Sequence, residues 1–138
     1  MLANEEVRRA MISTLTEDDY SELATGAIFA AVIEIDNQAL EPHFENLSER
    51  VEAEPERALL PALLMSDLSW AGADDFETLF KKATHALSSI RIRRFERMLD
   101  VLQIEMGQAE REQDVERYHR LYQEKIGLKN RILALSAP

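Results

Sequence analysis

The sequence predicts an all-α protein, in which a compact helical bundle is followed by a long helix and a projecting antiparallel helical hairpin. Its 138 residues include only four glycines and four prolines, too few turn formers for a many-stranded sheet. Good helix formers such as Ala, Leu, Glu and Arg dominate instead. Apolar residues also recur every three or four positions through most of the chain. We expect the bundle over residues 1–73 and the long helix with its hairpin over residues 74–138.

Three helices are predicted near the start of the chain. Asn4 is a typical helix cap, and an apolar stripe with four-residue spacing begins at Val7. Residues 16–19, Thr-Glu-Asp-Asp, resemble a capping box with Asp in place of Glu, and they predict a second helix start. The run over residues 24–35 is apolar on nearly every face, which is typical of a helix in the middle of a bundle.

Prolines indicate where helices begin or break in the rest of the bundle. An apolar stripe over residues 40–51 predicts another helix, with Pro42 in its first turn. Pro55 opens the next helix, and Pro61 should kink it or split it into two short pieces. The segment from Ser66 to Ala73, which contains the single tryptophan, is interpreted as a loop.

The second half of the chain predicts two longer helices. Residues 74–77, Asp-Asp-Phe-Glu, match a capping box, and no Pro or Gly follows before Gly107. The apolar pattern there indicates a helix of roughly thirty residues or more. Asp114 is a plausible cap for the last helix, with the turn near Gln113. That helix carries a coiled-coil-like seam of five residues: Leu121, Lys125, Leu128, Ile132 and Leu135.

The charge is uneven, with a net charge of −13 over residues 1–75 and +3 over residues 76–138. The overall charge of −10 argues against nonspecific nucleic-acid binding across the whole surface. There is no cysteine, which excludes disulfides and thiol nucleophiles. The most apolar stretch, residues 27–35, is too short to span a bilayer, and we expect a cytoplasmic protein without membrane contact.

Nothing in the sequence predicts catalysis, a cofactor or a metal site. The three histidines, His43, His85 and His119, are each isolated in their segments. Glu116 and His119 match one Glu-x-x-His unit of the di-iron bundles, but that architecture needs two such units and two further glutamates. The glycines are isolated too, so there is no phosphate-binding loop.

Two sets of residues are candidates for binding. The last helix mixes aromatic, aliphatic and cationic side chains of the kinds found at interface hot spots, at Tyr118, Leu121, Tyr122, Lys125, Leu128 and Lys129. The alternative is that both tyrosines pack inside the hairpin. A second cluster, Arg91, Arg94 and Arg97, is either an anion-facing patch or a solvated helix face.

The order of these features resembles the C-terminal helicase-binding domain of bacterial DNA primase. The resemblance covers nearly the whole chain and is carried by residues 2–9, 15–20 and 28–31 in the bundle. It continues through Arg93-Arg94-Phe95, residues 102–105 and 109–116, and Tyr122-Gln123-Glu124-Lys125 with Leu128-Lys129 in the hairpin. Two departures from the family pattern are visible. The family usually has a further helix ahead of the Asn-Glu-Glu segment, and Gln113 stands where a glycine often ends the first hairpin helix.

The resemblance implies a non-catalytic domain that docks primase on the hexameric replicative helicase. It would recruit RNA primer synthesis to the bacterial replication fork and modulate the helicase, without a cofactor. Single-stranded-DNA-binding protein would be a second partner, and direct nucleic-acid binding would be weak or absent. Two other interpretations stay open, namely a helicase N-terminal or loader-type domain, and a nucleic-acid-binding hairpin.

Overall fold

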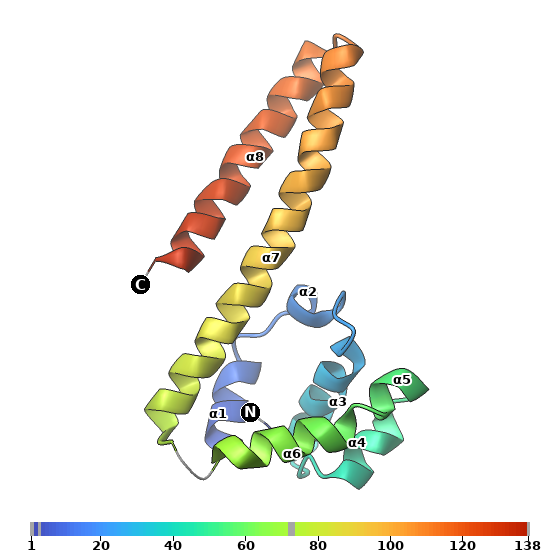
Figure 1. The fold of residues 1–138 in the computed structure, drawn as a ribbon, viewed down its shortest axis with the longest axis vertical. Coiled ribbons are helices and arrows are strands. Elements are labelled where there is room, and N and C mark those ends of the chain that lie inside the picture. Colours follow the sequence, from blue (N-terminus) through green and yellow to red (C-terminus); the bar gives the residue numbers. More distant parts are fainter. Residues whose placement is uncertain (1, 3, 72–73, 138) are drawn as a thin grey trace. The chain divides into compact units, whose positions relative to one another are not determined.

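The computed structural model describes Leu2, residues 4–71 and residues 74–137. Within these ranges all regular elements are α-helices and no strand occurs, so the predicted all-α fold class is confirmed (Figure 1). The helices in chain order are α1 (Glu5–Ile12), α2 (Glu17–Tyr20), α3 (Gly26–Asn37), α4 (Phe44–Arg50), α5 (Glu54–Arg57), α6 (Leu60–Ala71), α7 (Phe76–Arg111) and α8 (Val115–Ser136).

The chain divides into two compact units, Met1–Thr84 and His85–Pro138. We expected the division at residues 73 and 74, ahead of the long helix. The structure instead divides within α7, which contributes to both units. A boundary inside a continuous helix has no Pro, Gly or polar linker to mark it in the sequence.

The core of the first unit is built around α3. Ile28, Val32 and Ile35 on this helix are at most 5% exposed and belong to one cluster with Leu47 of α4 and Leu60 of α6. The expectation that α3 is central is thus correct for one broad face. Its other face is exposed and carries Ala27, Ala30, Glu34 and Asn37.

Two predicted helix caps are present in this unit. The Asn4 side chain accepts a hydrogen bond from the Val7 amide at 2.9 Å. Thr16 and Asp19 form the reciprocal capping box, with the Thr16 amide donating to the Asp19 carboxylate at 2.9 Å. Each bond satisfies an amide that the first helical turn would otherwise leave without a partner.

A buried ion pair ties α1 to α3. Arg8 is only 3% exposed, and its Nε lies 3.0 Å from an Asp36 carboxylate oxygen. The same guanidinium donates to the Leu2 carbonyl oxygen at 2.9 Å. Because removing either partner would leave a buried charge uncompensated, this contact fixes the relative placement of the two helices.

The connection into α3 needs a glycine. A Cβ atom built on Gly26 would lie 2.4 Å from the Tyr20 carbonyl oxygen, well inside the van der Waals distance. Tyr20 also stacks on Phe29, with ring centroids 5.9 Å apart. The close passage of the chain at Gly26 therefore brings α2 onto the first turn of α3.

The prolines lie differently from expectation at two points. Pro42 is not in the first turn of α4, because His43 is the cap and α4 begins at Phe44. The helix predicted to start at Pro55 does fall into two pieces, α5 and α6, but the break lies at residues 58 and 59, ahead of Pro61. Pro61 occupies the second position of α6, where a missing amide removes no helical hydrogen bond, so the helix runs on to Ala71.

The loop predicted from Ser66 to Ala73 is therefore wrong over its helical part. Residues 66–71 continue α6, while residues 72 and 73 lie outside the described residues. Ser, Asp and Gly in this stretch favoured a loop on local preference. The preceding leucines Leu60, Leu63 and Leu64 pack on the core of the unit, and this packing outweighs the local preference.

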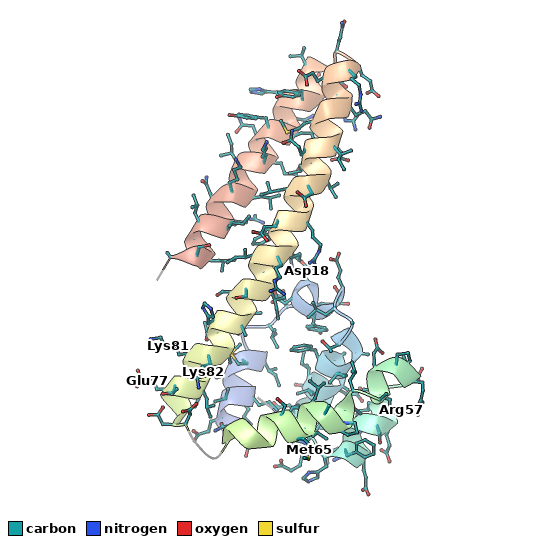
Figure 2. All side chains as sticks on the ribbon, viewed as in Figure 1. Asp18, Arg57, Met65, Glu77, Lys81 and Lys82 are labelled. Carbon is teal, nitrogen blue, oxygen red and sulfur yellow. The ribbon has the colours of Figure 1, made fainter. Side chains whose placement is uncertain are left out.

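The long helix α7 begins one residue later than the capping box indicated. Asp75, not Asp74, accepts from the amide three residues on, that of Thr78, at 2.9 Å. Asp74 instead pairs with Lys82 through its carboxylate, at 2.5 Å; Figure 2 labels Lys82 near the start of α7. The helix then continues for 36 residues, straight through Gly107.

The turn of the hairpin spans only residues 112–114. Gln113 adopts a left-handed conformation with φ 57°, and the Asp114 amide donates to the Ala109 carbonyl at 2.9 Å. This is the Schellman arrangement, which glycine normally occupies. Asp114 then caps α8 as predicted, accepting from the Arg117 amide at 2.9 Å.

Beyond the turn, α8 runs back antiparallel to α7 (Figure 1). The seam between them holds a small cluster of Phe95, Leu102 and Leu128, each at most 8% exposed. Partly buried residues that extend this cluster along the two helices are Leu99, Leu121, Ile132 and Leu135. The predicted helical hairpin is confirmed, and so is its seam.

Candidate docking face on the terminal helix

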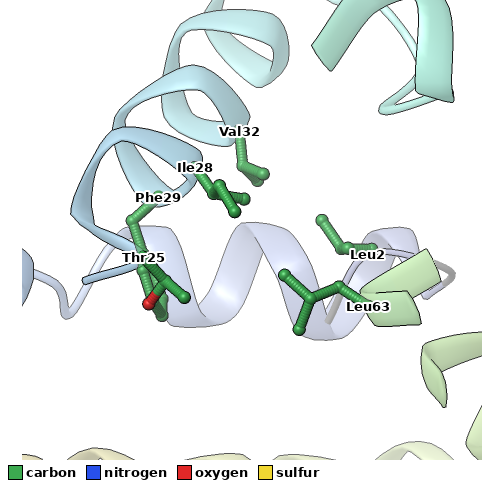
Figure 3. A pocket seen from close by; sticks show the side chains of 6 residues that line it. All are labelled: Leu2, Thr25, Ile28, Phe29, Val32 and Leu63. Atoms are coloured by element: carbon green, nitrogen blue, oxygen red, sulfur yellow. The ribbon is translucent and has the colours of Figure 1, made fainter. Parts of the chain in front are cut away.

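The first unit contains an apolar pocket, which is one candidate for a binding or catalytic site. It holds about 150 Å³ and is lined by five apolar side chains and one threonine: Leu2, Thr25, Ile28, Phe29, Val32 and Leu63 (Figure 3). No charged side chain lines it within the described part of the chain. Such a wall offers shape and apolar contact but no group for acid–base or nucleophilic chemistry.

The described residues also contain no cluster of three or more metal-ligating side chains. All three histidines are exposed: His43 stands just before α4, and His85 and His119 lie on α7 and α8. No helix in the described ranges combines the length and apolar character needed to cross a membrane. The remaining candidate is the surface of the hairpin.

The predicted partner-binding set on α8 separates into two faces. Leu121, Lys125 and Leu128 point to α7: Leu128 is 4% exposed in the seam, and the Lys125 ammonium donates to the Gln103 side chain at 2.6 Å. Tyr118 and Tyr122 are 37% and 44% exposed, on the side of the helix that the seam leaves open. The two leucines therefore hold the hairpin together, and the two tyrosines remain on its surface.

Lys129 belongs with the tyrosines. It is exposed, and among the described residues it has neither an ion pair nor a hydrogen bond through its side chain. It lies seven residues after Tyr122, which is two helical turns further along the same face. An unpaired ammonium on the same helix face as two aromatic rings favours a partner that brings negative charge or a π-face.

Three further apolar residues extend this face, and the sequence analysis did not single them out. Val115 is 79% exposed, Ile126 39% and Leu133 68%. Together with the tyrosines and the lysine they make one surface stripe, which we call the outer stripe: Val115, Tyr118, Tyr122, Ile126, Lys129 and Leu133. Its members recur with an eleven-residue offset, which is close to three turns of an α-helix.

The eleven-residue spacing was the signal that could have found these residues. Val115 precedes Ile126, Tyr118 precedes Lys129, and Tyr122 precedes Leu133 by this interval. The seam follows the shorter coiled-coil spacing on an adjoining side of α8. A helix with two apolar stripes has one that packs on its own partner helix and one left for something else.

The outer stripe ends at a shallow depression beside the hairpin turn. Val115 and Tyr118 line it, and so do the two acidic residues Glu110 and Asp114. Ala109 and Gln113 complete the lining. The depression is a concave feature at one end of a surface that is otherwise the convex side of a helix.

The arginine cluster on α7 is already engaged. Arg91, Arg94 and Arg97 each make at least one contact within the structure, and the Arg94 guanidinium lies 5.2 Å from the centre of the Phe95 ring. Arg97 is exposed, while Arg91 and Arg94 are half-buried. Because these arginines already make contacts within the chain, the outer stripe is the stronger candidate for a binding surface.

Comparisons with known proteins add no relative: no family model, no curated protein and no solved structure matches the chain.

Proposed function

We propose that the chain is a non-catalytic docking domain of the bacterial primase type, which binds the hexameric replicative helicase through α8. The resemblance in sequence supplies the identity of the partner. The observation that carries the docking role is the outer stripe, where two tyrosines and three aliphatic residues lie on the surface of a helix. Exposed aromatic and aliphatic side chains in one stripe are typical of protein–protein contact sites.

On this proposal the chain contributes position and not chemistry. Primer synthesis would belong to other domains of a parent primase, and this domain would hold them at unwound DNA in the bacterial nucleoid. The acidic tail of single-stranded-DNA-binding protein would be a second partner, to which we assign no residues. The helicase contact itself would also modulate the helicase, as the resemblance implies.

The energetics favour the tyrosines as anchors. An aromatic side chain that becomes buried at an interface commonly contributes on the order of 2 kcal/mol or more. An exposed charge at the rim contributes under about 1 kcal/mol and acts mainly on the rate of association. Tyr118 and Tyr122 are therefore the expected hot spots, and Lys129 is the expected rim charge.

The test measures binding of the full chain to the cognate helicase hexamer by fluorescence anisotropy or calorimetry. Tyr122→Ala should weaken binding more than about tenfold, and Lys129→Ala should mainly reduce its dependence on salt. Ile104→Ala is the matched control, because Ile104 is 70% exposed on α7 and lies outside the outer stripe. Tyr122→Ala and Ile104→Ala with equal effects would contradict the docking role of the stripe.

Single-stranded DNA should be assayed in parallel at two salt concentrations. A nucleic-acid-binding hairpin would bind DNA with an affinity that falls steeply as salt rises. Tight DNA binding together with no helicase binding would refute the proposal. A stable hexamer of the chain alone would favour the loader-type alternative.

A further inference from the structure

The positions of the outer stripe are spaced almost symmetrically about the middle of α8. Val115 and Leu133 are equally distant from position 124, and so are Tyr122 and Ile126. Tyr118 and Lys129 are placed symmetrically to within one residue. A helix face with this property can pair with a second copy of itself in the antiparallel sense.

In such a pairing each residue of the outer stripe would contact a residue of the second copy. Val115 of each copy would face Leu133 of the other, and Tyr122 would face Ile126, along about 27 Å of helix. The Lys129 ammonium would lie against the Tyr118 ring of the second copy, which is a favourable cation–π contact. Two such contacts arise by symmetry, one at each end of the paired helices.

The charges on the stripe select the antiparallel sense. Lys129 is its only charged member, and it has no ion pair or side-chain hydrogen bond within the described chain. In a parallel pair Lys129 would face Lys129, so that two like charges would meet in an apolar contact. In the antiparallel pair each lysine meets an aromatic ring instead.

We propose that two copies of this chain associate through their outer stripes, with the α8 helices antiparallel around a two-fold axis near position 124. This contact is isologous, so one patch serves both partners and the assembly closes at two copies. The inference does not depend on the identity of the helicase partner. If the docking proposal also holds, self-association covers the docking face, and the two contacts exclude one another.

Sedimentation equilibrium of the full chain alone, across a wide range of concentrations, tests the association without any helicase. The native chain should pass from monomer to dimer as its concentration rises. Leu133→Asp should weaken the dimer more than about a hundredfold, because the buried apolar side chain is lost twice in a symmetric contact. Ile104→Asp is the control and should leave the dimer intact, since Ile104 is exposed on α7.

The direction of pairing is tested by cross-linking, which is straightforward because the chain has no cysteine of its own. Val115→Cys mixed with Leu133→Cys should give a disulfide-linked dimer containing one copy of each. Val115→Cys alone should not cross-link, because its two sulfurs would lie about 27 Å apart along the paired helices. A chain that stays monomeric at every concentration overturns the proposal, and so does faster cross-linking of Val115→Cys with itself.

Discussion

Substituting alanine for glycine should destabilise this protein at Gly26 and stabilise it at Gly107 and Gly127. Gly26 opens α3, whereas Gly107 and Gly127 lie in the interiors of α7 and α8. A Cβ atom at Gly26 would lie 2.4 Å from the Tyr20 carbonyl oxygen, and at the other two positions nothing lies within 4 Å. Relieving the clash at Gly26 requires the backbone to move, because the obstacle is a main-chain atom.

The magnitudes follow from the two situations. Overpacking of this kind typically destabilises a protein by about 1–3 kcal/mol, so Gly26→Ala should lower the free energy of unfolding by that amount. Gly107→Ala and Gly127→Ala should each raise it by about 0.5–1 kcal/mol, because alanine has less backbone entropy to lose in a helix. Urea unfolding followed by circular dichroism measures all three variants against the native chain.

The three variants serve as controls for one another, since each replaces a glycine with an alanine. Gly26→Ala with a free energy of unfolding equal to that of the native chain, or greater, would show that the close passage at Tyr20 is absent. Loss of stability at Gly107 or Gly127 would show that a neighbour covers those positions.

Two further expectations concern the ends of α7. Gln113→Gly should stabilise the protein by up to about 1 kcal/mol in urea unfolding, because φ at this position is 57° and glycine adopts it without strain; Gln108→Gly, inside the same helix, should destabilise it by a similar amount. At the other end, hydrogen bonds from the backbone and side chain of Thr78 lower the pKa of Asp75 below its usual 3.8. Because the folded pKa lies below the unfolded one, this cap favours the helix above about pH 3.8 and is lost as pH falls through the lowered value. The Thr78 amide resonance in NMR spectra should titrate with a midpoint below 3.8, and this titration should be absent in Asp75→Asn.

Several helix starts could be predicted from the sequence because the capping hydrogen bond joins residues that are close in the chain. Asn4, Thr16 with Asp19, and Asp114 each bind an amide within three residues, so the pattern of side chains contains the whole interaction. The tandem Asp74 and Asp75 offered two equivalent caps, and the sequence pattern favoured the wrong one. Ser66 to Ala71 was misjudged because packing of the earlier leucines on the core, which is not local, keeps that segment helical.

The candidate site was predicted only in part, for a geometric reason. Tyr118 and Leu121 are three residues apart, so they lie near one another on α8 and share one periodic pattern in the sequence. Which of them faces α7 depends on the rotation of the helix about its axis, and this rotation is fixed by the seam with Phe95 and Leu102. Val115 and Leu133 were overlooked because each lies near an end of the helix, and the residues four positions further inward, His119 and Lys129, are polar.

The unbroken course of α7 across residues 84 and 85 determines how this protein can be taken apart in the laboratory. Truncation at that point would strip four carbonyl groups on one fragment and four amide groups on the other of their helical partners. The fragments would fray at the new ends, although each retained its own cluster of apolar side chains. A hairpin prepared for isotope labelling or crystallisation should therefore begin no later than Asp75, so that it keeps its native cap.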